Sequence, residues 1–221
     1  FLVPLFGAAG SAQGQSASYN EAADLATLSN LTNTRMHYQR LSSPLRSKSA
    51  VWIGLESVVD SLPSGSDDYV HLEELVREKS ASELQALVAQ GALSYEQITR
   101  YFIARIHMIE TDDARYLNAV IALNPLAIDA AQAADRELRE GKEVTLDSLF
   151  GLPVLLKDNI GFEGLPTSAG AAALAENNAA DAFVARRLKT NGVIILGKAN
   201  LSEWAYFFCT GCPSGYSALG G

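Results

Sequence analysis

The strongest constraint on the fold is a strand–helix–strand pattern in the second half of the chain. Residues 153–156 (Pro-Val-Leu-Leu) and residues 193–196 (Val-Ile-Ile-Leu) are short apolar runs of the kind found in buried strands. Between them, Asp181 is expected to cap a helix that ends at Asn191-Gly192. Two strands joined by a helix at this spacing predict a β-α-β unit with a parallel strand pair, which places the chain in the α/β class.

Local end signals predict helices ahead of this unit. Ser80-x-x-Glu83 and Ser94-x-x-Gln97 are capping boxes in front of apolar residues at helical spacing. Two successive helices are therefore expected between residue 80 and residue 110.

A strand and a third helix are expected next. Residues 117–123 form a short apolar run typical of a strand, and Asn124-Pro125 offers a cap and a first-turn proline. An alanine-rich stretch follows and is expected to end as a helix near Gly141.

The first seventy residues differ from the rest. Residues 1–12 read as part of a signal peptide, cleaved near Ala12, with an apolar arm packed on the body as the alternative. Residues 13–70 are expected to be a loosely helical extension that ends in a linker, and residues 71–221 to be the folded domain. The predicted location is secreted or exported. No run approaches the ~18 apolar residues of a membrane span.

Two triplets, at Asn30 and Asn200, match the acceptor pattern for N-glycosylation. Asn200 is expected to lie where a helix starts within residues 200–203, so a sugar there would crowd packed structure. We therefore expect that this second triplet is not used.

The net charge of −8 argues against a polyanionic partner. No basic run marks a nucleic-acid surface, so no nucleic-acid partner is expected.

Lys157 is the candidate catalytic residue. It follows the apolar run 153–156 directly, and burial in apolar surroundings disfavours an ammonium ion, which predicts a neutral base. The alternatives are a lysine that reaches solvent or one that pairs with Asp158. Ligands of parallel sheets gather at the carboxyl ends of strands, so Lys157 and Lys198 are expected to face one crevice. Asp158 and Asn159 are expected to form a turn, and Lys198 a surface pair with Glu203.

Several ordered segments resemble the amidase signature family, over roughly residues 80–221 and most densely from residue 149. They include Lys157-Asp158-Asn159, residues 167–170 (Thr-Ser-Ala-Gly) and residues 197–203 (Gly-Lys-Ala-Asn-Leu-Ser-Glu), followed by the final Gly-Tyr-Ser-Ala-Leu-Gly-Gly. The resemblance implies the N-terminal half of an α/β/α sandwich with a mixed sheet, preceded by helices. It also implies amide hydrolysis by a Ser-cisSer-Lys triad in which Lys157 is the base, acting on a small-molecule or peptide amide.

The two serines of such a triad lie beyond the matching segments in the family. Ser42-Ser43 is far upstream, and Ser214 and Ser217 lack the Gly-Ser-Ser context, so we expect these serines to be loop residues. The chain is therefore predicted to be an inactive N-terminal fragment of a hydrolase. The alternatives are a non-catalytic remnant of the fold and the amidotransferase subunit that acts on charged tRNA.

No metal or organic cofactor is expected. Cys209-x-x-Cys212 precedes a turn, which favours a local disulfide or inert thiols over redox chemistry. His37, His71 and His107 are too scattered in sequence to complete a zinc site.

Overall fold

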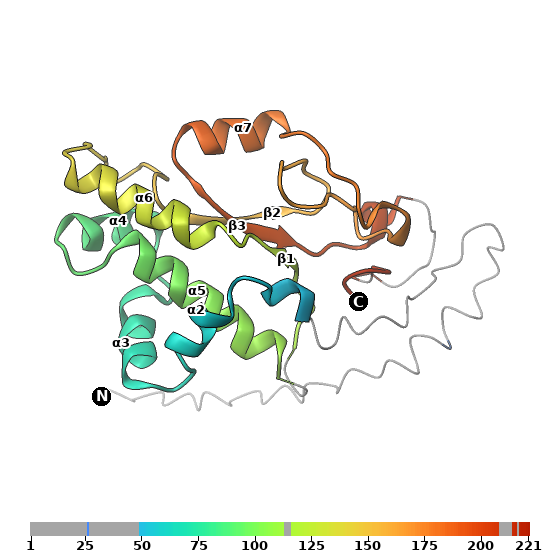
Figure 1. Ribbon diagram of the computed structural model, residues 1–221, viewed down its shortest axis with the longest axis horizontal. Coiled ribbons are helices and arrows are strands. Elements are labelled where there is room, and N and C mark those ends of the chain that lie inside the picture. Colours follow the sequence, from blue (N-terminus) through green and yellow to red (C-terminus); the bar gives the residue numbers. More distant parts are fainter. Residues whose placement is uncertain (1–25, 27–48, 113–115, 208–213, 216) are drawn as a thin grey trace, which may run out of the picture.

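The protein is described here by a computed structural model that covers residues 26, 49–112, 116–207, 214, 215 and 217–221. Within these residues a three-stranded sheet has the order β1-β3-β2. The central strand β3 (Ile194–Ala199) is antiparallel to β1 (Val120–Leu123) and parallel to β2 (Pro153–Lys157) (Figure 1). Helix α7 (Phe183–Thr190) connects β2 to β3. The predicted β-α-β unit and mixed sheet are confirmed.

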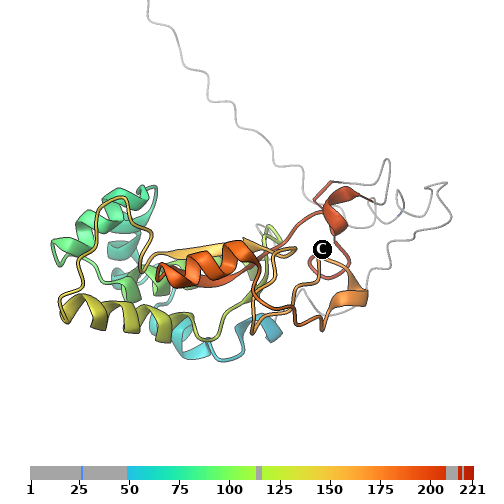
Figure 2. The same ribbon diagram turned by 90° about the horizontal axis from the view of Figure 1, so that it is seen from above.

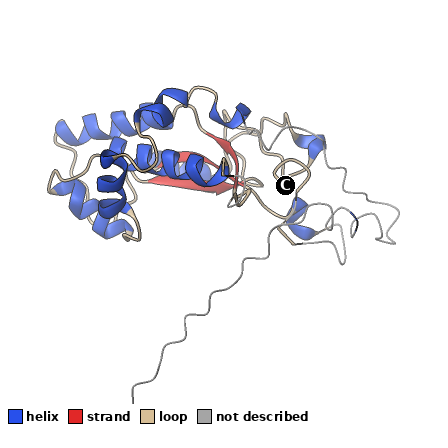
Figure 3. Cartoon of the chain, turned by 90° about the horizontal axis from the view of Figure 1, so that it is seen from below, coloured by secondary structure: helices blue, strands red, loops and turns tan. Residues whose placement is uncertain are grey.

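The other helices lie mostly before the sheet in sequence (Figure 3). They are η2 (Ser49–Trp52), α2 (Glu56–Ser61), α3 (Asp67–Val76), α4 (Ala81–Ala89), α5 (Tyr95–Glu110), α6 (Ala127–Arg139), η3 (Ala172–Leu174) and η4 (Glu203–Tyr206).

Two apolar clusters cover opposite faces of the sheet. Ile194 and Leu196 of β3 belong to the larger cluster, together with residues of α2 to α6. Ile195, the residue between them, packs with Leu156 of β2 and Ala185 of α7 in the smaller cluster. This alternation is the period of two that a strand requires. Helices therefore lie on both faces of the sheet, with α7 opposite α5 and α6 (Figure 2), as the predicted α/β/α layering requires.

Both predicted capping boxes are present. Glu83 N donates to Ser80 Oγ, Gln97 N donates to Ser94 Oγ, and each partner side chain accepts from the backbone of the capping residue. Local sequence is sufficient to specify these two helix starts.

Two other predicted caps are wrong, because tertiary partners take the side chains. Asn124 lies two residues before the N-cap Leu126 of α6, and its amide donates to Ile195 O of β3. Asp181 precedes the N-cap Ala182 of α7, and its carboxylate accepts from Lys189 Nζ and Glu163 N. The helix expected from residue 200 is the short 3-10 helix η4.

Part of the predicted extension packs on the body of the protein. Trp52, Leu55 and Val58 are buried in the same cluster as α5. The expected linker contains Ser66, whose hydroxyl caps α3 by accepting from Tyr69 N. No helix among the described residues has the length and apolar character needed to cross a bilayer. The predicted leader, residues 1–12, lies outside the described residues.

Candidate functional site

The four segments that resemble the amidase signature family meet beyond the carboxyl ends of β2 and β3 (Figure 1). Asp158 N donates to Ala199 O at 3.0 Å, and Asp158 O accepts from Ala169 N at 3.0 Å. Leu219 N donates to Gly170 O at 3.1 Å, which joins the C-terminal turn to the same loop. Segments far apart in sequence thus form one site at the edge of the sheet where the α/β architecture places ligands.

Lys157 is the last residue of β2, and its side chain is exposed. The expectation of a fully buried strand is wrong, because β2 lies at the edge of the described sheet and only Leu156 of its five residues is buried. The lysine that apolar surroundings enclose is instead Lys198 of the central strand.

The two lysines lie on opposite faces of the sheet, so the expectation that they face one crevice is also wrong. Lys157 pairs in register with Ala199, and Leu156 pairs with Lys198. Side chains alternate along a strand, so the paired residues Leu156 and Lys198 share a face and Lys157 projects from the other.

Lys198 is fully buried, with 0% of its surface exposed, so the expected surface pair with Glu203 does not form. Its Nζ donates to Ile160 O at 2.7 Å and to Thr167 Oγ1 at 2.8 Å, and lies 3.5 Å from Asp158 Oδ1. Burial lowers the pKa of Lys198, and the nearby Asp158 carboxylate opposes this shift. The ammonium ion therefore has three oxygen partners in a closed environment.

Asp158 turns the chain after β2, as predicted, but its carboxylate also bonds across the loop. Its Oδ2 accepts from the hydroxyl of Ser168, from Ser168 N at 3.2 Å and from Gly170 N at 3.5 Å. The side chain of Asp158 is 2% exposed, so these contacts replace its hydration. The aspartate thereby joins the Lys-Asp-Asn segment to the Thr-Ser-Ala-Gly segment.

Asn200 holds the C-terminal turn. Its Nδ2 donates to Asn118 O at 2.8 Å and to Gly221 O at 3.2 Å, while its Oδ1 accepts from Ser217 Oγ and Leu201 N. The amide has no hydrogen-bonding capacity left for an attached sugar, which agrees with the expectation that this triplet is not used. Ser217 is buried and bonded, as expected of a structural loop residue.

Glu203 also fastens this turn, since Ala218 N donates to its Oε2 at 2.9 Å. Burial raises the pKa of the Glu203 carboxyl, and the hydrogen bond from Ala218 partly offsets the shift.

The contact between Lys198 and Thr167 has the geometry of a base and a hydroxyl nucleophile. Thr167 is only 9% exposed, however, and the ammonium ion faces Asp158 and a carbonyl. A substrate carbonyl cannot reach this hydroxyl, so we assign the contact a structural role.

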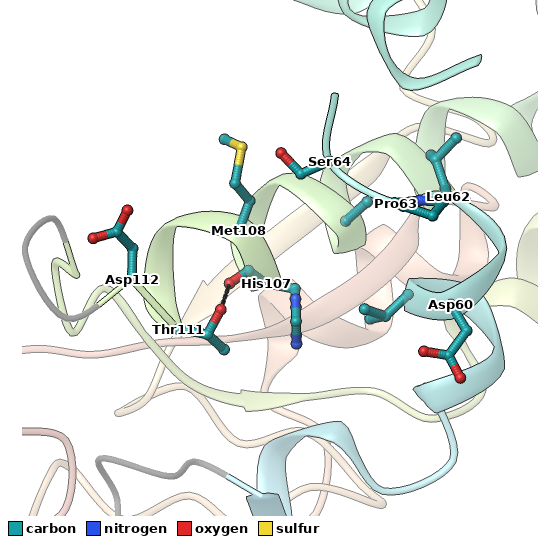
Figure 4. A pocket seen from close by; sticks show the side chains of 10 residues that line it. Asp60, Leu62, Pro63, Ser64, His107, Met108, Thr111 and Asp112 are labelled. Atoms are coloured by element: carbon teal, nitrogen blue, oxygen red, sulfur yellow. Dashed lines mark hydrogen bonds between the residues drawn. The ribbon is translucent and has the colours of Figure 1, made fainter. Parts of the chain in front are cut away.

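A separate pocket of about 520 Å³ lies between α2 and α5 (Figure 4). His107, Met108 and Asp60 are among its lining residues. Burial lowers the pKa of His107, and Asp60 partly opposes this. The imidazole lies edge-on to Trp52, with ring centroids 4.7 Å apart. None of the four converging segments contributes to this pocket, and we assign it no chemistry.

Sequence reasoning missed the buried polar cluster formed by Asp158, Thr167, Ser168 and Lys198. The available signal was the length of the apolar run before Lys198, which is typical of a central strand covered on both faces.

Within the described part of the chain no three His, Cys, Asp or Glu side chains are grouped as a metal site would require. Cys209, Cys212, His37, Ser42 and Ser43 lie outside the described residues.

Comparisons with known proteins support the resemblance. The sequence profile of the Amidase family matches residues 97–217. A probable amidase of Arabidopsis thaliana is 36% identical over 168 residues, which cover 75% of this chain and 32% of that protein. A glutamyl-tRNA(Gln) amidotransferase subunit of Salinispora arenicola is 35% identical, over 64% of this chain and 27% of that protein.

Two solved structures share the fold. The peptide amidase of Stenotrophomonas maltophilia is 42% identical with a TM-score of 0.62, over 66% of this chain and 29% of that one. An amidase family protein of Bacillus anthracis is 31% identical with a TM-score of 0.63, over 81% of this chain and 34% of that one. The chain spans about a third or less of the length of these relatives. Since the Amidase profile covers more than half of the sequence and the same segments converge in space, the chain belongs to the amidase family.

Proposed function

We propose that the complete protein hydrolyses a carbon–nitrogen amide bond, with Lys157 as the general base. The observation that carries this proposal is the placement of Lys157. Its side chain is exposed at the carboxyl end of β2, beside a loop built from the segments that resemble the family. The peptide amidase of Stenotrophomonas maltophilia, which is similar in structure, supports the same reaction class.

In the proposed reaction the Lys157 amine takes a proton from a serine hydroxyl, which in turn deprotonates the attacking serine. The attacking oxygen adds to the amide carbonyl, the amine leaves with a proton, and water releases the acyl group. The resemblance places both serines after the Gly-Tyr-Ser-Ala-Leu-Gly-Gly segment. We therefore assign no serine of this chain to the triad, and Lys157 is the one catalytic residue assigned.

The exposure of Lys157 sets a condition on this mechanism. A solvated ammonium ion keeps its proton at neutral pH and is not a base. The proposed role requires that bound substrate, or further chain such as the part of the relatives that this chain does not match, covers Lys157 and excludes water.

We propose a peptide amide as the first substrate to test. A solved structure of the peptide amidase with 42% identity holds the competitive inhibitor chymostatin. Small-molecule amides are the second class to test, because the fold alone does not select between acyl groups.

The test uses the protein expressed from its complete coding sequence and measures ammonia release from a C-terminally amidated peptide. Lys157→Ala is expected to lower kcat by roughly 10²–10⁴-fold, the usual contribution of a positioned base. Lys142→Ala is the control, because Lys142 is an exposed lysine in a loop after α6 and is paired with Glu137. Undiminished turnover by Lys157→Ala contradicts the assignment, and a wild-type protein without turnover on either amide class favours the non-catalytic remnant.

A second candidate function is that of the amidotransferase, because one of its glutamyl-tRNA(Gln) amidotransferase chains is among the relatives. Under this alternative, efficient ammonia release depends on partner chains and on charged tRNA. Turnover of a simple amide by the purified protein alone favours the amidase.

We also propose that the protein is exported, on the basis of the leader-like residues 1–12. Sequencing the N-terminus of the protein recovered from the medium tests for cleavage near Ala12.

A further inference from the structure

We propose that Lys198 is a positioning residue that holds the loop after Lys157 in one conformation and thereby fixes where the Lys157 amine lies. The catalytic part of this inference rests on the proposed function. The structural part stands on the geometry of the buried cluster alone.

Lys198 links the two ends of the loop formed by residues 158–170. At the near end, its Nζ donates to Ile160 O and lies 3.5 Å from Asp158 Oδ1. At the far end it donates to Thr167 Oγ1. Asp158 completes the link by accepting from Ser168 and Gly170. One ammonium ion and one carboxylate therefore join both ends of the loop.

The cost of burying these charges indicates a role other than general stability. Lys198 and Asp158 are 0% and 1% exposed, and a buried ion pair adds little net stability compared with apolar residues of the same volume. Buried polar groups do specify one arrangement, because any other arrangement leaves them unpaired. The cluster is thus suited to fixing the conformation of the loop.

The backbone of the loop needs such support. Ala169 has a φ of 51°, in the left-handed region that is unfavourable for a residue with a Cβ. Residues in this region persist where surrounding contacts determine the conformation. The contacts here are the hydrogen bonds from Ser168 N and Gly170 N, on either side of Ala169, to Asp158.

The loop acts on Lys157 through the main chain. Lys157 directly precedes Asp158, whose N–H is bonded to Ala199 O and whose carbonyl is bonded to Ala169 N. The carbonyl of Lys157 itself accepts from Ile160 N at 2.9 Å. A loosened loop therefore displaces the backbone of Lys157, and displacements of about 1 Å are enough to reduce catalysis strongly.

The experiment compares four variants of the protein expressed from its complete coding sequence. Lys198→Met keeps the length of the side chain and removes its charge, Asp158→Asn removes the opposite charge, and the double variant removes both. Lys142→Met is the control, because it also breaks a lysine–carboxylate pair, but one that is exposed and lies outside the cluster.

The first readout is amide hydrogen exchange, which does not depend on activity. Lys198→Met is expected to accelerate exchange within residues 158–170 by about tenfold or more while exchange in α5 stays unchanged. The double variant is expected to recover part of this protection, since it leaves no buried charge unpaired. Unchanged exchange in the loop of Lys198→Met overturns the inference. If Lys198→Met does not fold, the double variant decides: protection of its loop equal to the wild type also overturns it.

The second readout is kinetic. Lys198→Met is expected to lower kcat by about tenfold to a hundredfold with KM changed by about twofold or less, because the amine is displaced and the substrate pocket is not. An unchanged kcat per folded molecule refutes the positioning role. Failure of the proposed function has a different result, namely full activity of Lys157→Ala or an inactive wild type, and neither result alters the exchange measurement.

Discussion

Replacement of Gly192 by alanine tests how the parallel strand pair is held together. Gly192 lies between α7 and β3 with a φ of +71°, and its carbonyl accepts from Gly151 N, just before β2, at 2.8 Å. A Cβ added at this position would lie 2.2 Å from Cδ2 of Phe150, a ring that is 4% exposed and packs edge-on against Tyr95. The methyl group therefore meets both backbone strain and a ring with little room to move.

Two costs add up in Gly192→Ala. A left-handed conformation costs a residue with a Cβ about 1–2 kcal/mol. Displacing a packed ring costs about 1–3 kcal/mol more. The free energy of unfolding is expected to fall by about 2–5 kcal/mol in total.

Gly91→Ala isolates the second cost. Gly91 has the same φ of +71°, but a Cβ there has no atom within 4 Å. Urea denaturation of both variants is expected to show that Gly192→Ala loses about 1–3 kcal/mol more than Gly91→Ala. Equal losses would refute the argument, because they would mean that Phe150 moves aside without cost.

Two further predictions concern the surface and the C-terminal turn. Leu155 is 37% exposed on the edge strand β2, beside an apolar hollow between α5 and the sheet, so Leu155→Lys is expected to reduce aggregation of the 221-residue chain in light scattering, whereas Leu117→Lys, at a 68% exposed site away from that edge, is not. Burial raises the pKa of Glu203, so the folded protein binds this proton more tightly than the unfolded chain, and the contribution of Glu203 to stability falls as the pH rises above the ordinary glutamate range. Glu203→Gln is therefore expected to have the higher Tm at about pH 7 and to lose that advantage near pH 4; a constant difference across this range would contradict the assignment.

Helix starts were predictable where the capping partner is near in sequence. The boxes at Ser80 and Ser94 need only a side chain three residues ahead, so the sequence contains the whole interaction. Asn124 and Asp181 have the same intrinsic preference for caps, but partners on β3 and along α7 bind them in other ways. Such competition depends on the tertiary fold and leaves no trace in a local pattern.

The exposure of the two lysines was not predictable for a related reason. The runs that end in Lys157 and precede Lys198 are both apolar, yet one forms the edge of the described sheet and the other its centre. Strand order decides which run is covered on both sides, and strand order is a property of the whole domain. The location of the site at the carboxyl ends of the strands followed from the β-α-β pattern alone.

The alternation of side chains along β2 makes the length of this strand a functional quantity. Deleting one residue between Gly151 and Lys157 would turn the terminal amine toward α7 and the closed interior, even though every residue type at the site stayed the same. Point substitutions in this stretch are therefore tolerable in a way that insertions and deletions are not.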